Sequence, residues 1–253
     1  MISRFCLKAV VLLLIAVLPV GALEAPSEPL LVAAAADLAP LEVQLTQGFA
    51  VVHGGPVRFV FGASGMLARQ IENGASYDVY LSANEQFVQQ LAASGRLHKD
   101  TQACYATGRL GIWSARTHIK EIEEITKPSY RLIAIPNPAH APYGAAAVAM
   151  LRRLGLWEKV EPKAVYAENV REALEFATTG NAEAVLTAWT LLIRKPGAIL
   201  LPDSSHPPIL QFGGVVKGSA NETRARAFMH FLLSPAGQEI LRRGGLYPPP
   251  ATR

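Results

Sequence analysis

The sequence contains little cysteine, little charge and no cluster of basic residues. Only Cys6 and Cys104 occur among 253 residues, and 17% of the residues are charged against 50% that are hydrophobic. Because Cys6 lies in a segment that we expect to be removed, Cys104 would stand alone. This excludes an intramolecular disulfide and a zinc site built on a cysteine pair. Stability must therefore come from a large hydrophobic core, for which the composition is sufficient.

Residues 1–22 have the pattern of a secretory signal. Two basic residues come first, residues 9–20 are an apolar run, and Val20-Gly21-Ala22 provides small residues for cleavage. The apolar run is too short for a typical membrane span. No cysteine follows it, which argues against a lipoprotein anchor. We therefore expect residues 1–22 to be removed and the mature protein to be exported.

The charge balance argues against nucleic acid and membrane surfaces as partners. Residues 1–22 hold two basic residues and no acidic one, so the rest of the chain has 22 Lys and Arg against 20 Asp and Glu. A net charge of about +2 without a basic patch does not favour binding to nucleic acid or to a membrane surface.

Apolar strand-like runs alternate with helical patterns in two successive series. Such continuous apolar strands between helices of about ten residues indicate mainly parallel α/β sheets covered on both faces. The second series begins near Gly108, and a final helix begins after Asn221, a candidate N-cap. We predict a first unit of residues 23–106 plus 214–253 and a second unit of residues 107–213. The predicted strands are "LLVAAAA", "VRFVFGA", "YDVYLSA", "RLGIWSA", "YRLIAIPN", "AVYAEN" and "AEAVLTAWTLLI".

Four strand-to-helix junctions carry small or capping residues. In open α/β sheets ligands bind beyond the carboxyl ends of the strands, where these junctions lie. Helix N-termini there offer free N–H groups to an anion. Any single junction is more simply explained as a turn with a cap, and Asp37 and Asn169 are suitable N-caps. Together the four favour a ligand cleft. They are Ala35-Ala36-Asp37, Ala63-Ser64-Gly65, Pro142-Tyr143-Gly144 and Glu168-Asn169-Val170.

Along nearly the whole mature chain the sequence resembles the periplasmic molybdate-binding proteins of ABC transporters, which have the two-lobed type II solute-binding fold. The most specific stretch follows the second predicted strand and spans more than twenty residues in the order and spacing of the family. The matching stretches are "VAAAADL", "FGASGMLARQIENGASYDVYLSA", "IPNPAHAPYGAAAVAMLRRLGLW", "AENVREAL" and "SPAGQEILRRGGL".

The resemblance implies a tetrahedral oxyanion held between the lobes by hydroxyl and N–H groups, without lysine or arginine. Ser64 falls on a hydroxyl ligand of the family. Tyr143 and Val170 fall on backbone donors, and Ala36 and Asp37 would add backbone N–H groups. The implied partner is a membrane permease with its ATPase. The implied protein is not an enzyme, has no cofactor, lies in the periplasm and is expected to be a monomer.

Two positions depart from the family pattern. Members often have serine, threonine or asparagine where this chain has Asp37, and a carboxylate there would repel a dianion. We expect Asp37 to turn its side chain away as an N-cap and to offer only its N–H group. Ala188 replaces a tyrosine whose hydroxyl contacts the ligand in part of the family. Tyr143 could supply a hydroxyl in its place.

Other readings of the same residues stay open. An exported hydrolase would use Ser64 as its nucleophile, but "FGASGM" is not the G-x-S-x-G motif, and no motif places His140 or His206 as a base. A receptor for sulfate or another small oxyanion would keep the fold and change the cargo. Lobe opening is expected at hinges near residues 105–108 and 212–214.

Overall fold

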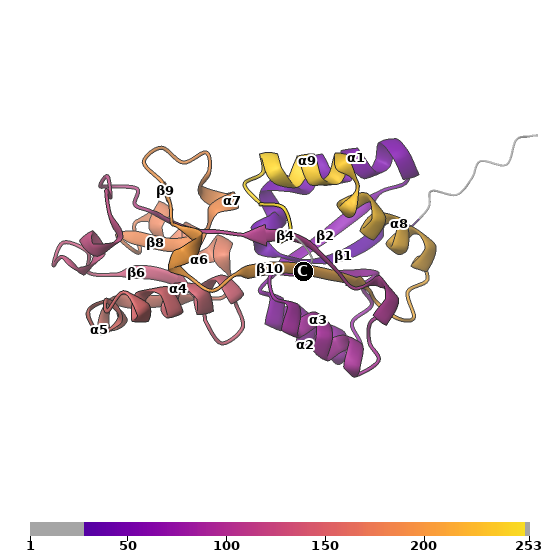
Figure 1. The fold of residues 1–253 in the computed structure, drawn as a ribbon, viewed down its shortest axis with the longest axis horizontal. Helices are drawn as coiled ribbons and strands as arrows, with labels where there is room; N and C mark the ends of the chain where they lie inside the picture. Colours follow the sequence, from indigo (N-terminus) through magenta and orange to yellow (C-terminus); the bar gives the residue numbers. More distant parts are fainter. Residues whose placement is uncertain (1–27, 251–253) are drawn as a thin grey trace, which may run out of the picture.

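The computed structural model describes residues 28–250, which form two lobes side by side along the long axis of the molecule (Figure 1). Each lobe has one five-stranded sheet with helices on its faces. This is the two-lobed α/β architecture expected from the sequence. The predicted signal segment, residues 1–22, lies outside the described residues. No helix within residues 28–250 is long and apolar enough to cross a bilayer.

The sheet of the first lobe has the strand order β2-β1-β3-β10-β4. Strand β1 pairs in parallel with β2 and β3, whereas β10 is antiparallel to β3 and β4. The strands are β1 (Leu30–Ala35), β2 (Val57–Gly62), β3 (Val79–Ser82), β4 (Ala103–Gly108) and β10 (Ile209–Val215). The helices of this lobe are α1 (Glu42–His53), α2 (Ser64–Glu72), α3 (Glu85–Ala93), α8 (Glu222–Leu233) and α9 (Pro235–Arg243).

Alternate residues of β1 enter two separate cores, because successive side chains of a strand point to opposite faces. Val32 and Ala34 pack in one cluster with residues of α1, α8 and α9, while Ala33 packs in another with residues of α2 and α3. The continuous apolar run of β1 is therefore buried on both faces, as its composition indicates.

The sheet of the second lobe has the order β7-β6-β8-β5-β9, with β6 parallel to β7 and β8, and β5 antiparallel to β8 and β9. The strands are β5 (Leu110–Trp113), β6 (Ile133–Pro136), β7 (Ala164–Ala167), β8 (Ala184–Ala188) and β9 (Ile199–Leu200). The helices are α4 (Pro142–Arg153), α5 (Trp157–Val160), α6 (Val170–Thr179) and α7 (Trp189–Leu192). Short 3-10 segments occur at η1 (Ala36–Leu41), η2 (Lys99–Thr101), η3 (Ile122–Thr126), η4 (Glu161–Lys163) and η5 (Asp203–Ser205).

Three local predictions differ from the structure. The helix expected from Asp37 onward starts as the 3-10 segment η1, and α1 begins only at Glu42 after Pro40, which has no N–H for a regular helical ladder. The predicted strand "AEAVLTAWTLLI" ends at Ala188 and turns into the short helix α7. Strand β4 was not predicted, because its alternation of small and polar residues carries little hydrophobic signal.

The chain passes between the lobes at two places that lie next to each other. Strand β4 belongs to the first sheet and β5 to the second, with only Arg109 between them. The return follows β9, and β10 then pairs directly with β4. Helices α8 and α9, formed by the last part of the chain, pack beside α1 on the first lobe (Figure 1).

Candidate functional site

The four junctions identified in the sequence meet at one cavity between the lobes. Its volume is about 10 Å³, close to the space that one water molecule needs. Five of the six predicted site residues line it, and Ala188 does not. The lining residues are Ala35, Ala36, Asp37, Gly62, Ala63, Ser64, Ala83, Ala141, Pro142, Tyr143, Asn169 and Val170.

Ser64 is the first residue of α2 and is 1% exposed. Its hydroxyl oxygen accepts a hydrogen bond of 3.0 Å from the N–H of Ala83, and its carbonyl accepts one of 2.8 Å from the Tyr80 hydroxyl. Since the Ala83 N–H occupies a lone pair of the hydroxyl oxygen, the hydroxyl proton is left to donate to a ligand. Ser64 thus lines the cavity with a hydroxyl whose proton has no partner among the described residues.

Three helices begin at this cavity with available N–H groups. A helix leaves its first N–H groups without a partner inside the helix, and its dipole adds partial positive charge at the same end. Within residues 28–250, the N–H groups of Ser64, Tyr143 and Val170 donate to no other residue. Together with the Ser64 hydroxyl they form a set of donors suited to the oxygens of an anion.

Asn169 holds the α6 terminus in place. Its side-chain oxygen accepts from the N–H groups of Arg171 and Glu172, at 2.9 and 3.2 Å, which is the N-cap predicted from the sequence. Thr187 in β8 also donates to the Val170 carbonyl at 2.9 Å. These contacts leave the Val170 N–H free while fixing its position.

Asp37 does not cap a helix, which corrects the expectation stated above. The N-cap position of η1 is Ala35, and no side chain caps that segment. The fully buried Asp37 carboxylate instead accepts from the Tyr143 hydroxyl at 2.8 Å and from the Gln211 amide at 2.6 Å, both at Oδ2. Burial raises the pKa of the Asp37 carboxyl from 3.8 to about 6, although these two hydrogen bonds lower it. The Asp37 carboxylate thus bonds to Tyr143 and Gln211, which are distant in sequence, and does not cap the helix that follows it.

The Tyr143 hydroxyl takes part in the hydrogen-bond network around Asp37. Its ring crosses from the second lobe to the first, where a Cβ on Gly108 would lie 2.2 Å from the hydroxyl oxygen. Ala188 stands where part of the family has a tyrosine whose hydroxyl contacts the ligand. It is fully buried at the end of β8, in one core cluster with Ala36, Tyr143 and Val170. Tyr143 donates its hydroxyl proton to Asp37, so it does not replace that missing donor.

Two of the junction positions are glycine because neighbouring backbone leaves no room for a side chain. The N–H of Gly65 donates to the His140 carbonyl of the other lobe at 3.0 Å, and a Cβ on Gly65 would lie 3.1 Å from the His140 Cα. A Cβ on Gly144 would lie 1.8 Å from the Pro136 carbonyl oxygen, where α4 passes the end of β6. Their smallness therefore allows close contact between lobes and between helix and strand, a role that sequence reasoning missed.

The lining set contains no lysine, arginine or histidine, so no positive side chain meets a ligand there. Among residues 28–250 no group of three His, Cys, Asp or Glu side chains could hold a metal ion. The Ser64 hydroxyl contacts the Ala83 N–H rather than a histidine within the described chain, and the His140 ring lies against Glu168, 3.1 Å from its carbonyl oxygen. The donors thus suit anion binding and not a serine hydrolase.

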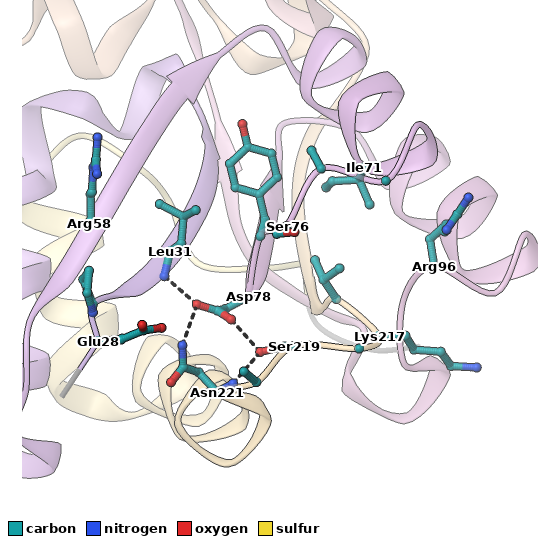
Figure 2. A pocket seen from close by; sticks show the side chains of 17 residues that line it. Glu28, Leu31, Arg58, Ile71, Ser76, Asp78, Arg96, Lys217, Ser219 and Asn221 are labelled. Atoms are coloured by element: carbon teal, nitrogen blue, oxygen red, sulfur yellow. Dashed lines mark hydrogen bonds between the residues drawn. The ribbon is translucent and has the colours of Figure 1, made fainter.

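A larger cavity of about 470 Å³ lies at the opposite end of the first sheet, where β1 and β3 begin. Figure 2 shows the Asp78 carboxylate at its wall, bonded to the Leu31 N–H at 2.7 Å, the Ser219 hydroxyl at 2.6 Å and the Asn221 amide at 3.2 Å. Both carboxylate oxygens therefore have partners, and the cluster fixes the residues before α8. Asn221 occupies the predicted N-cap position of α8, but its side chain makes no cap hydrogen bond and its amide donates to Asp78 instead.

Comparisons with known proteins agree with this geometry. A family model described as "Bacterial extracellular solute-binding protein" matches residues 30–247. The molybdate-binding protein ModA of Rhodobacter capsulatus is 33% identical over 227 residues, which cover 88% of this chain and 90% of that protein. ModA of Azotobacter vinelandii is 31% identical over 193 residues, covering 73% and 76%.

Solved structures show the same fold. The Azotobacter vinelandii periplasmic molybdate-binding protein has a TM-score of 0.82 at 30% identity, covering 87% of this chain and 100% of that one. The sulfate-binding protein SubI of Mycobacterium tuberculosis has a TM-score of 0.75 at 16% identity, covering 87% and 86%, and shares the fold. These matches confirm the resemblance and the two-lobed α/β fold predicted from the sequence. The chain belongs to the family of bacterial extracellular solute-binding proteins.

Proposed function

We propose that this protein captures molybdate or tungstate in the cavity between its lobes and delivers the ion to an ABC permease. The observation that carries the proposal is the convergence of four junctions, from both lobes, on one small cavity with available N–H groups and an oriented hydroxyl. Relatives that cover most of the chain at 31–33% identity are named molybdate-binding proteins. As a member of a solute-binding family, the protein binds its ligand and does not transform it.

Neutral donors suit a receptor that must bind a dianion and later release it. Preorganised N–H and O–H groups can hold a tetrahedral oxyanion without a counter-charge. When the lobes separate, the donors of α2 move away from those of α4 and α6, and the site is dismantled.

Each predicted residue has a defined part in the proposal. Ser64 donates through its hydroxyl and its N–H group. Tyr143 and Val170 donate through backbone N–H groups, as do Ala36 and Asp37 from η1. Ala188 marks the family hydroxyl that this chain lacks, and its position outside the lining set leaves it without a direct contact.

The lobes and their hinge follow from the sheet arrangement. We propose a first lobe of residues 23–106 plus 214–253 and a second lobe of residues 107–213. Partial support comes from the sheets, because β4 and β10 pair in the first sheet; β4 runs to Gly108 and β10 begins at Ile209, so both proposed boundaries fall inside these two strands. Rotation about the two adjacent crossings would open the cleft.

The setting of the protein follows from its family. The family is extracellular, which agrees with export, and we propose that residues 1–22 act as the signal and that the mature protein works in the periplasm. We further propose that it is a monomer with no cofactor, whose partners are the oxyanion and the permease.

Sulfate is the main alternative cargo, because a sulfate-binding protein shares the fold at 16% identity. A calorimetric titration of residues 23–253 with molybdate, tungstate, sulfate and phosphate at one pH decides between them. One-to-one binding of molybdate and tungstate, with weak or no binding of sulfate and phosphate, is expected. Tight binding of sulfate alone, or of none of the four, would contradict the proposed cargo while leaving the fold in place.

A further inference from the structure

The Asp37 carboxylate is unevenly satisfied. Its Oδ2 accepts two hydrogen bonds, from the Tyr143 hydroxyl and the Gln211 amide, whereas its Oδ1 is buried without a hydrogen-bond partner in residues 28–250. The Gln211 amide is oriented in turn by the Tyr105 hydroxyl, which donates to its oxygen at 3.0 Å. The network therefore holds the carboxyl group of Asp37, a residue that lines the anion cavity, and leaves one of its oxygens without a partner among the described residues.

The side chains that face Asp37 bring no positive charge. Burial keeps the pKa of Tyr143 and of Tyr105 well above the usual value for tyrosine, so both stay neutral donors. The elements packed against η1 are α1, α6, α7, β1 and β2. Within the described chain none of their charged side chains bonds to Asp37. The charged or titratable ones are Glu42 and His53 of α1, Arg58 of β2, and Arg171 and Glu175 of α6, all exposed, and Glu172 of α6, which bonds the Glu168 N–H.

An ionised Asp37 would conflict with the proposed ligand. The carboxylate and the dianion would lie close together in a buried site, where the repulsion between like charges is screened far less than in water. The unused Oδ1 would also present lone pairs to a ligand whose oxygens are themselves acceptors. A proton between the two oxygens removes both the repulsion and the unsatisfied acceptor.

We propose that Asp37 binds the oxyanion as a neutral acid, with one proton held between Asp37 Oδ1 and an oxygen of the ligand. The inference rests on the proposed function and adds to it a coupling between oxyanion binding and proton uptake. Asp37 then acts as a direct hydrogen-bond donor to the ligand and as a specificity residue. All donors in this site contact oxygens of the ion, so none is a ligand of a metal atom.

The chemistry of the free protein makes this proton available. Burial raises the pKa of Asp37 to about 6, so that at pH 7 about nine-tenths of the free protein is ionised there. Bound dianion raises the pKa further. Binding of molybdate at pH 7 or above should therefore take up close to one proton, and each further pH unit should weaken binding about tenfold.

The test is calorimetric titration of residues 23–253 with sodium molybdate at pH 7.5, in buffers that differ in ionisation enthalpy. The slope of the observed enthalpy against the buffer enthalpy counts the protons, and a count near one is expected. The dissociation constant should rise about tenfold between pH 7.5 and pH 8.5. The Asp37→Asn variant supplies an amide donor without titrating, so it should show a count near zero and a flat pH profile.

Asp78→Asn is the matched control, because Asp78 is another buried carboxyl of the first lobe, outside the anion cavity. It should keep the proton count and the pH profile of the native protein. Native protein that binds molybdate with a count near zero overturns the proposal and leaves the proposed function standing. Absence of molybdate binding at every pH overturns both. The count on native protein decides the question even where a variant does not fold.

Discussion

The hydroxyl of Ser64 is the one side-chain donor in the cavity that structure and sequence pattern both select. The Ala83 N–H takes one lone pair of its oxygen, which directs the remaining proton to a ligand. Apart from the Asp37 carboxyl, the other proposed contacts use backbone N–H groups, which most side-chain substitutions leave in place. Substitution of Ser64 is therefore the most direct single-residue test of binding.

Ser64→Ala should weaken molybdate binding by about 1.5–3 kcal/mol, the usual worth of a hydrogen bond to a charged group. Calorimetric titration measures the loss. Ser82→Ala is the matched control, since the buried Ser82 hydroxyl bonds Asn84 and neither residue belongs to the lining set. Unchanged affinity in the Ser64 variant, or an equal loss in both variants, would remove Ser64 from the site.

The sequence could predict the elements that carry the site but not the contacts between them. Apolar strands followed by small or capping residues predicted the four junctions, and the Asn169 cap was predicted because its partners lie within three residues. Asp37 satisfies the same local rule, yet its partners Tyr143 and Gln211 lie 106 and 174 residues away. Such contacts form only when distant parts of the chain come together in the fold, so no local pattern reveals them.

Helix α6 links stability to binding through its cap. Asn169→Ala removes the acceptor of two N–H groups and should lower the free energy of unfolding by about 1 kcal/mol. It should also weaken molybdate binding, because the Val170 N–H begins the same helix. Urea denaturation and calorimetric titration measure the two effects separately.

Asn84→Ala is the matched control for that cap, since Asn84 caps α3 by accepting from the Gln86 N–H, away from the anion cavity. It should cost similar stability and leave molybdate affinity unchanged. Equal weakening of binding by both variants would show that loss of stability, and not the position of the Val170 N–H, explains the effect.

Contact between the lobes depends on the bare backbone at Gly65. Gly65→Ala would place a methyl group 2.9 Å from the Phe87 ring and 3.1 Å from the His140 backbone, so it opposes the closed arrangement of the whole molecule. We expect molybdate affinity to fall about tenfold or more, because the methyl group meets the His140 backbone of the other lobe. The free energy of unfolding should fall as well, because the methyl group also crowds the Phe87 ring inside the first lobe. Titration and urea denaturation provide the two values.

Gly48→Ala gives the comparison for crowding within one lobe. A Cβ there would meet the ends of the Ile240 and Phe231 side chains at 2.9 Å, all inside the first lobe. It should change stability and not affinity. Gly65→Ala with native affinity would contradict the role of this contact in closure.

The buried carboxyl at the lobe interface also sets how stability varies with pH. Asp37 has a pKa of about 6 in the folded protein against 3.8 for an ordinary aspartate, so between these values the folded state binds more protons than the unfolded state. Stability from this residue is therefore fully present below pH 4 and is lost as pH rises through about 6, with a total of roughly 3 kcal/mol. Glu183 acts in the opposite direction, because its pKa is lowered.

Asp37→Asn isolates the contribution of Asp37 ionisation to stability, because the amide oxygen can still accept hydrogen bonds from Tyr143 and Gln211 while no charge is buried. Without ligand, the variant should exceed native protein in free energy of unfolding by roughly 3 kcal/mol at pH 7.5, and the excess should shrink toward zero near pH 4. Urea denaturation at five pH values measures this difference, with Asp203→Asn at an exposed position as control. An excess that does not vary with pH would mean that Asp37 is not the titrating group, since every other carboxyl is common to both proteins and cancels.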